Sequence, residues 1–85
     1  MPNIKQQKKR VRTAAEERLT NLRYRSTAKT LAKRLRDAVT EGDQARVADE
    51  YKQLISWLDR SAARGAIHRN TAARRKSQAD RLISR

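Results

Sequence analysis

The stretch from residue 3 to residue 36 limits the possible folds most, because it is strongly basic and contains no helix-breaking residue. It holds twelve Lys or Arg side chains against Glu16 and Glu17, a local net charge of +10, and neither Gly nor Pro. A single helix over this stretch would be roughly 50 Å long, longer than a globular core requires. Because such a rod repels itself, we expect it to lie along a polyanion.

The charge divides the chain into three blocks. Residues 37–59 carry two basic and six acidic side chains (net −4), whereas residues 60–85 carry eight basic and one acidic (net +7). With the first block these sum to the formal +13 of the 85-residue chain. This balance indicates a nucleic-acid partner, with an acidic membrane as the weaker rival. The middle block can face water while both ends face an anion.

Length and composition predict one domain, residues 1–85, with a thin aliphatic core. The chain has no Cys and no Phe, so a disulfide or a thiolate site is not available. Neither a long apolar run nor the apolar part of a secretory signal is present. We expect a cytoplasmic protein; the acid-free, basic first 15 residues keep an organelle transit peptide open as an alternative.

Capping residues divide the chain into three helices, at about 3–40, 43–64 and 69–84. Asn3 is a candidate N-cap for the first, and Gly42 suits the left-handed position that ends it. Asp43 then caps the second helix and Gly65 ends it, while Asn70, or less favourably His68, caps the third. The prediction is an all-α, three-helix bundle with a long, projecting N-terminal helix.

Apolar periodicity places the core. The second helix has one clear stripe, made of Val47, Ala48, Tyr51, Leu54, Ile55, Leu58 and Ala62. The first helix carries a stripe over residues 24–39 and a different, nearly opposite line of Ile4, Val11, Ala15, Leu19 and Leu22. We therefore expect only residues 24–39 to pack and residues 3–22 to project. A kink near Leu22 is the alternative. In the third helix, Ala72, Ala79 and Ile83 share a face, with Leu82 at its margin.

The cations suit phosphate binding better than catalysis. Arg outnumbers Lys by fifteen to seven, and guanidinium binds phosphate bidentately. Tyr24, Tyr51 and Trp57 are interpreted as too few and too far apart for single-strand stacking, which favours folded RNA recognised by shape and backbone. The only histidine, His68, cannot form an acid–base pair, and the acidic residues lack metal-ligand spacing. We expect no enzyme, no metal and no cofactor.

One motif is specific. Leu58-Asp59-Arg60 and Ala62-Ala63-Arg64-Gly65 precede Ile67-His68-Arg69-Asn70-Thr71-Ala72-Ala73-Arg74-Arg75-Lys76-Ser77, and the chain opens on Asn3-Ile4-Lys5. Over nearly its whole length the sequence resembles the small-subunit ribosomal protein S-twenty family of bacteria. The resemblance implies a three-helix bundle whose first helix reaches into ribosomal RNA, and a monomeric small-subunit protein that binds 16S ribosomal RNA directly and early in assembly.

The resemblance and the charge pattern together predict RNA-binding residues on two basic surfaces. On the first helix these are Asn3, Lys5, Lys8, Lys9, Arg10, Arg12, Arg18, Arg23, Arg25, Lys29, Lys33 and Arg36. At and beyond the second connection they are His68, Arg69, Asn70, Thr71, Arg74, Arg75, Lys76, Ser77 and Arg81. The rival functions are a nucleoid-type duplex DNA-binding protein and a membrane-surface or partner-binding helix.

Overall fold

The computed structural model describes residues 4–84, and side chains from residue 11 onward. Three helices account for almost all of this part of the chain: α1 (Ile4–Glu41), α2 (Gln44–Arg64) and α3 (Arg69–Ile83). The all-α prediction and the long first helix are confirmed. The molecule is elongated, with extents of 59 × 20 × 13 Å.

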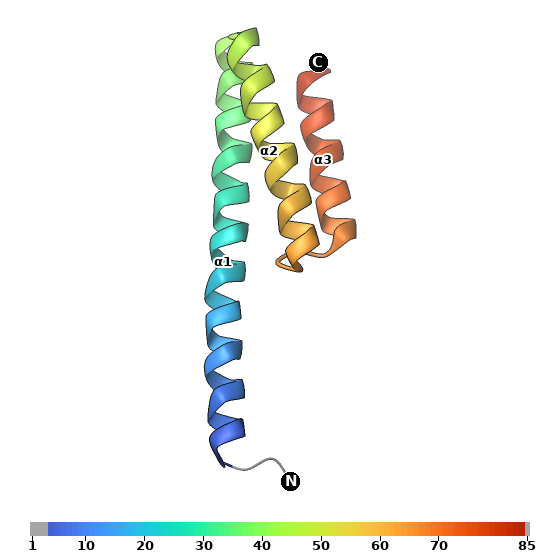
Figure 1. The fold of residues 1–85 in the computed structure, drawn as a ribbon. Coiled ribbons are helices and arrows are strands. Elements are labelled where there is room, and N and C mark those ends of the chain that lie inside the picture. Colours follow the sequence, from blue (N-terminus) through green and yellow to red (C-terminus); the bar gives the residue numbers. More distant parts are fainter. Residues whose placement is uncertain (1–3, 85) are drawn as a thin grey trace.

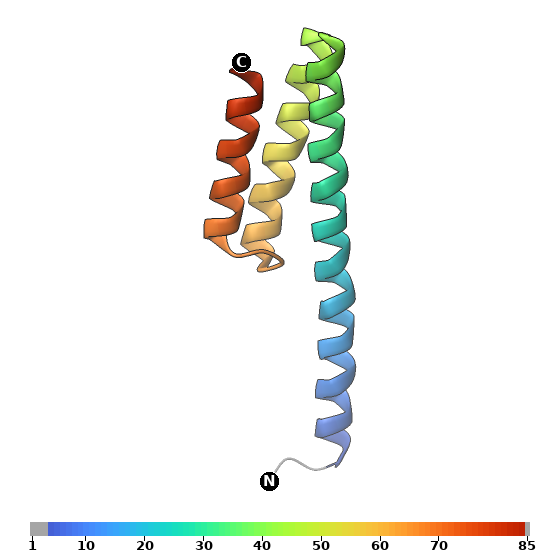
Figure 2. The same ribbon diagram turned by 180° about the vertical axis from the view of Figure 1, so that it is seen from behind.

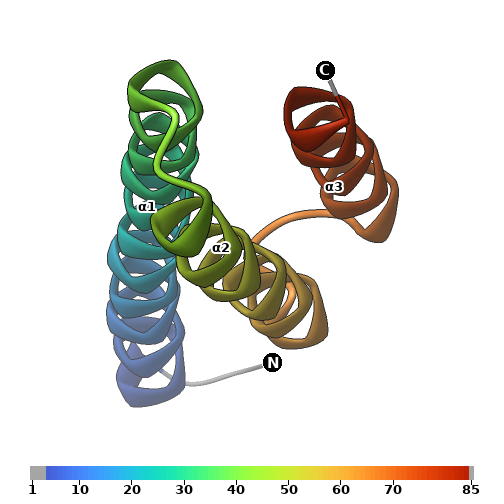
Figure 3. The same cartoon turned by 90° about the horizontal axis from the view of Figure 1, so that it is seen from above.

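The helices pack at one end of this rod. α2 returns antiparallel beside the C-terminal half of α1, and α3 packs on α2, so that the N-terminal half of α1 projects beyond both (Figures 1 and 2). Seen along the bundle, α2 lies at the apex of a V whose arms are α1 and α3 (Figure 3). α2 therefore supplies the centre of the core.

The connections follow local backbone chemistry. Gly42 has φ 73° and Gly65 has φ 83°, left-handed values that cost other residues a steric clash with Cβ. The Asp43 carboxylate accepts a hydrogen bond from the Arg46 N–H at 3.1 Å, the expected N-cap bond of α2. These turns are short, which forces sequential helices to lie side by side.

The N-cap of α3 differs from the favoured prediction. His68, in an extended conformation, precedes the helix, and its Nδ1 accepts the Asn70 N–H at 3.1 Å. Asn70 itself lies in the first helical turn. The buried Ile67 holds the connector against the core, which leaves His68 rather than Asn70 at the boundary.

The core lies where the two predicted stripes meet. Leu35 of α1 and Leu58 of α2 are fully buried. The buried apolar residues are Ala28, Leu31, Leu35, Ala38, Leu54, Leu58, Ala66, Ile67, Ala72 and Ala79. Many are alanines, so the helices approach closely around a small number of larger aliphatic side chains.

Two core assignments need correction, and one buried residue was not predicted. Ala48 is exposed, because the first part of α2, before Tyr51, has a neighbouring helix only in α1. Ile83 is 39 % exposed, whereas Leu82 packs against the core, since the last turn of α3 meets the other helices on the side of Leu82. Ser61 is fully buried, and its hydroxyl donates to the Trp57 carbonyl at 2.7 Å, which satisfies its polar group.

The projecting half of α1 is one straight continuation of the packed half. Val11 is 71 % exposed, Leu19 59 % and Leu22 58 %. Because α1 is unbroken through Leu22 and this apolar line reaches no core, the kink alternative is wrong. Asn3 lies outside the described residues.

Candidate nucleic-acid interface

Most of the cations whose side chains the structure describes have no carboxylate partner. Among the described side chains the ion pairs are Arg46–Glu41, Arg46–Glu50 and Lys76–Asp59. Glu16 and Glu17 make no ion pair in this part of the chain. The acidic block thus neutralises only a few basic residues, and the remaining charge is available to an external anion.

The packed half of α1 carries a basic edge. Arg25, Lys29, Lys33 and Arg36 are all exposed, and their spacing of three and four residues aligns them on one side of the helix. The core stripe occupies another side, so these cations face solvent while their helix is anchored by buried leucines. The edge is therefore a rigidly mounted row of positive charges.

This edge continues into a groove between α1 and α3. Leu54 of α2 forms its floor, with Ala28 and Ala79 beside it, and Arg36 and Arg75 stand on its two sides. The structure thus brings one predicted residue from each of the two basic surfaces to the same concavity.

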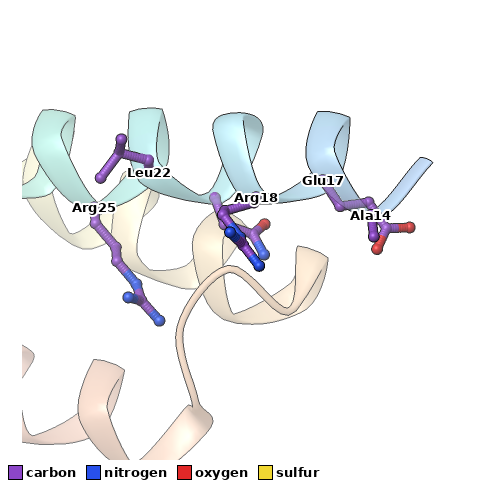
Figure 4. Close-up of a pocket in the computed structure, with 6 residues that line it drawn as sticks. Ala14, Glu17, Arg18, Leu22 and Arg25 are labelled. Atoms are coloured by element: carbon purple, nitrogen blue, oxygen red, sulfur yellow. The ribbon is translucent and has the colours of Figure 1, made fainter. Parts of the chain in front are cut away.

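A second concave region lies where α1 leaves the bundle. Arg18 and Arg25 extend from α1 on the side of the connector between α2 and α3 (Figure 4), and Leu22 lines the same region. The Arg25 Nε donates to the Ala66 carbonyl at 3.4 Å. Arg25 lines a further depression with His68 and Arg69. The corner between the projecting helix and the connector is accordingly basic.

The outer face of α3 presents four of the predicted residues. Asn70, Arg74, Ser77 and Arg81 are exposed, and their spacing aligns them on the side away from Ala72 and Ala79. Thr71 and Arg75 are half-buried, and Arg75 lies toward α1. His68 and Arg69 are exposed beside them.

Lys76 differs from the other predicted cations. Its Nζ lies 2.5 Å from Oδ1 of Asp59 on α2. This contact ties α3 to α2, so Lys76 is the predicted α3 cation whose charge is already matched within the protein.

On the projecting half of α1, the predicted residues Arg12, Arg18 and Arg23 are exposed. Lys5, Lys8, Lys9 and Arg10 lie within the helical backbone of α1, but their side chains lie outside the described ones. The structure therefore shows that these residues belong to α1, and their side-chain contacts lie outside what it describes.

The sequence did not predict how the aromatic residues pair within the fold. Tyr24 and Trp57 stack with ring centroids 4.7 Å apart and planes inclined by 19°. The guanidinium carbons of Arg64 and Arg60 lie 5.4 and 5.8 Å from the Tyr24 and Trp57 centroids. The spacing of Trp57, Arg60 and Arg64 along one side of a helix was visible beforehand; the pairing with Tyr24 depends on how α1 and α2 are aligned.

Tyr51 bonds α2 to α3 at the opposite end of the bundle. Its hydroxyl donates to the Asp80 carboxylate, and this bond, with burial and the charge of Asp80, raises the pKa of Tyr51.

No group of three or more His, Cys, Asp or Glu that could hold a metal occurs among the described residues. In the same part of the chain, no helix combines the length and the apolar character needed to cross a bilayer.

Fold and surface together define a class: a small, all-helical, strongly basic protein whose unpaired cations lie along helix edges and shallow grooves. The family model for ribosomal protein S20 matches residues 2–84. The chain therefore belongs to the ribosomal protein S20 family, whose members are structural proteins of the ribosome and not enzymes. This confirms the resemblance found in the 67–77 motif.

Curated relatives agree over almost the full length. The chain is 40 % identical over 84 residues to the small ribosomal subunit protein bS20 of Beutenbergia cavernae, covering 99 % of this chain and 98 % of the relative. It is 46 % identical over 77 residues to the bS20 of Bifidobacterium longum subsp. infantis, covering 91 % and 90 %. The bS20 of Thermomicrobium roseum is 45 % identical over 78 residues, covering 92 % and 79 %.

Proposed function

We propose that this chain is a structural component of the small ribosomal subunit that binds 16S ribosomal RNA directly as a monomer and helps the subunit assemble. Family membership and the names of the relatives support the ribosomal setting. The observation that carries the direct contact with RNA is the unpaired charge: among the described side chains, the predicted cations of α1 and α3 other than Lys76 make no ion pair.

The mechanism is electrostatic. Each guanidinium that meets a phosphate forms charge-assisted hydrogen bonds, and each neutralised phosphate releases condensed counterions. The basic edge of α1 and the outer face of α3 act as two surfaces whose separation is set by packing on α2. Binding of this kind recognises the shape and backbone of folded RNA, which stabilises the RNA conformation in which both surfaces are filled.

The substitution Arg74→Ala tests this mechanism. The side chain is exposed on the outer face of α3, so its loss should weaken binding to 16S ribosomal RNA and reduce the salt dependence by roughly one unit of slope, with little change in stability. Lys52→Ala is the matched control, because Lys52 is exposed on α2 within the acidic block. Unfolding of Arg74→Ala, or equal effects of both substitutions, would contradict the assignment.

The nucleoid-type DNA-binding alternative has no support from the three relatives described above, each of which is named as a small ribosomal subunit protein. Competition between 16S ribosomal RNA and duplex DNA at matched salt separates the two functions. We expect the RNA to win by a wide margin at cellular salt, and equal affinities would refute the proposal. In bacteria a ribosome-associated protein is cytoplasmic; an organellar ribosome remains the alternative setting.

A further inference from the structure

Four residues form a stacked cluster at the joint between α1 and α2, near the level where α1 leaves the bundle. We call Tyr24, Trp57, Arg60 and Arg64 the joint cluster. The Trp57 indole N–H donates to the Tyr24 carbonyl at 2.9 Å, and the two rings stack at 4.7 Å. Arg60 lies over Trp57 and Arg64 over Tyr24. The half-buried rings therefore hold two guanidinium groups at the surface.

A guanidinium over a ring is prepared for a second contact. The ring occupies one face of the cation, while the N–H donors point outward in its plane and stay free to bind oxygen. Arg60 and Arg64 are exposed, and within the described part of the chain neither has an ion pair or a hydrogen bond. Because the ring contact already restricts each side chain, binding an anion costs less conformational entropy than for a free arginine.

The joint cluster faces away from the outer face of α3. Tyr51 and Asp59 mark the side of α2 that meets α3, through Asp80 and Lys76. Arg60 follows Tyr51 by nine positions, which at about 100° per residue is half a turn around the helix. Arg64 lies one turn further along the same side. The two arginines thus lie on the back of the α1–α2 pair, opposite α3.

Their charges fit an anion with regularly spaced oxygens. Two cations four residues apart on one helix repel each other, and no acidic side chain within the described residues offsets them. Phosphate groups of a nucleic-acid backbone match the planar donors bidentately.

We propose that the joint cluster is a third RNA contact, in which Arg60 and Arg64, positioned by Trp57 and Tyr24, bind the phosphate backbone of an RNA segment on the face opposite α3. The inference rests on the proposed function. With this third contact, the bundle binds RNA segments on two sides instead of on one side. The stacked rings of Tyr24 and Trp57 act as positioning residues for the arginines.

Single charge removals test the contact. Arg60→Gln and Arg64→Gln should each weaken binding to 16S ribosomal RNA roughly three- to tenfold at cellular salt and lower the salt slope by about 0.7–0.9 units. Lys52→Gln removes the same charge from another side of α2 and should change neither quantity. If both arginine variants behave like Lys52→Gln, or lower only the melting temperature, the cluster merely joins two helices and the proposal is overturned.

Cleavage from a tethered probe locates the RNA. Because the chain has no Cys, one introduced thiol gives a single attachment point for a hydroxyl-radical source. Gln53 is exposed on the same side of α2 as Arg60, and Ala45 is exposed in the first turn of α2. The probe is attached through Gln53→Cys in one variant and through Ala45→Cys in the other. We expect the complex to be cut from position 53 and not from position 45.

The outcomes separate the two proposals. If the native chain shows no preference for 16S ribosomal RNA, the proposed function itself fails. If the native chain binds this RNA but the probe at position 53 leaves it uncut, only the third contact is refuted.

Discussion

The free energy of unfolding should depend on the core where α1 and α2 meet and hardly at all on the projecting half of α1. The same substitution at two positions measures the difference. Leu58→Ala removes a side chain with 0 % exposure, whereas Leu19→Ala removes one that is 59 % exposed. The chemistry and the helical setting are alike, so burial is the main variable.

The magnitude follows from the atoms removed. Leu→Ala deletes three carbons, worth about 0.8 kcal/mol each when fully buried, and the cavity left behind adds to this loss. We expect Leu58→Ala to cost about 3–4 kcal/mol, which is roughly 12–30 °C in melting temperature for a domain of this size. Leu19→Ala loses little burial and gains helix propensity, so its effect should stay within about 0.5 kcal/mol.

The assay is urea unfolding followed by tryptophan fluorescence. Trp57 is the only tryptophan and stacks on Tyr24 between α1 and α2, so its emission reports the packed region and not the projecting helix. A loss of stability in Leu19→Ala comparable to that in Leu58→Ala would show that the projecting half joins a core, and the reasoning would be refuted.

Two further outcomes concern a pH dependence and a turn. The Tyr51 pKa lies above its ordinary value of 10.0, first because of its hydrogen bond to Asp80 and then because of burial and the Asp80 charge; this contribution is present below pH 10 and is lost as pH rises through the raised pKa. Alkaline unfolding of Tyr51→Phe, followed by circular dichroism, should therefore lose that part of its pH dependence, and an unchanged profile would contradict the coupling. Gly65→Ala places a Cβ at φ 83° and should cost about 1 kcal/mol in urea unfolding. An equal or higher stability would show that the turn relaxes.

Several features followed from local rules and could be predicted. Asp43 and Gly65 end or begin helices through contacts within a few residues, and the exposed line of Val11, Leu19 and Leu22 followed from its angular offset to the core stripe. Such features depend on neighbours in the chain, so periodicity and capping chemistry suffice. The family resemblance rested likewise on one contiguous motif.

Other features depended on which helices meet and at what height. Periodicity along one helix does not predict contacts between different helices. Examples are the ion pair of Lys76 with Asp59, the position of Arg36 opposite Arg75, and the packing of Leu82 instead of Ile83. A shift of one turn between α1 and α2 would separate Tyr24 from Trp57 while leaving both apolar stripes intact.

The sequence by itself determined a strongly basic, three-helix chain with a projecting first helix, because charge, caps and periodicity are local properties. Only the tertiary structure decided which cations are free, which are matched and which are stacked on rings. Those states depend on distances of a few ångströms between side chains far apart in the chain, and these distances are set by the packing of alanines and leucines in the core.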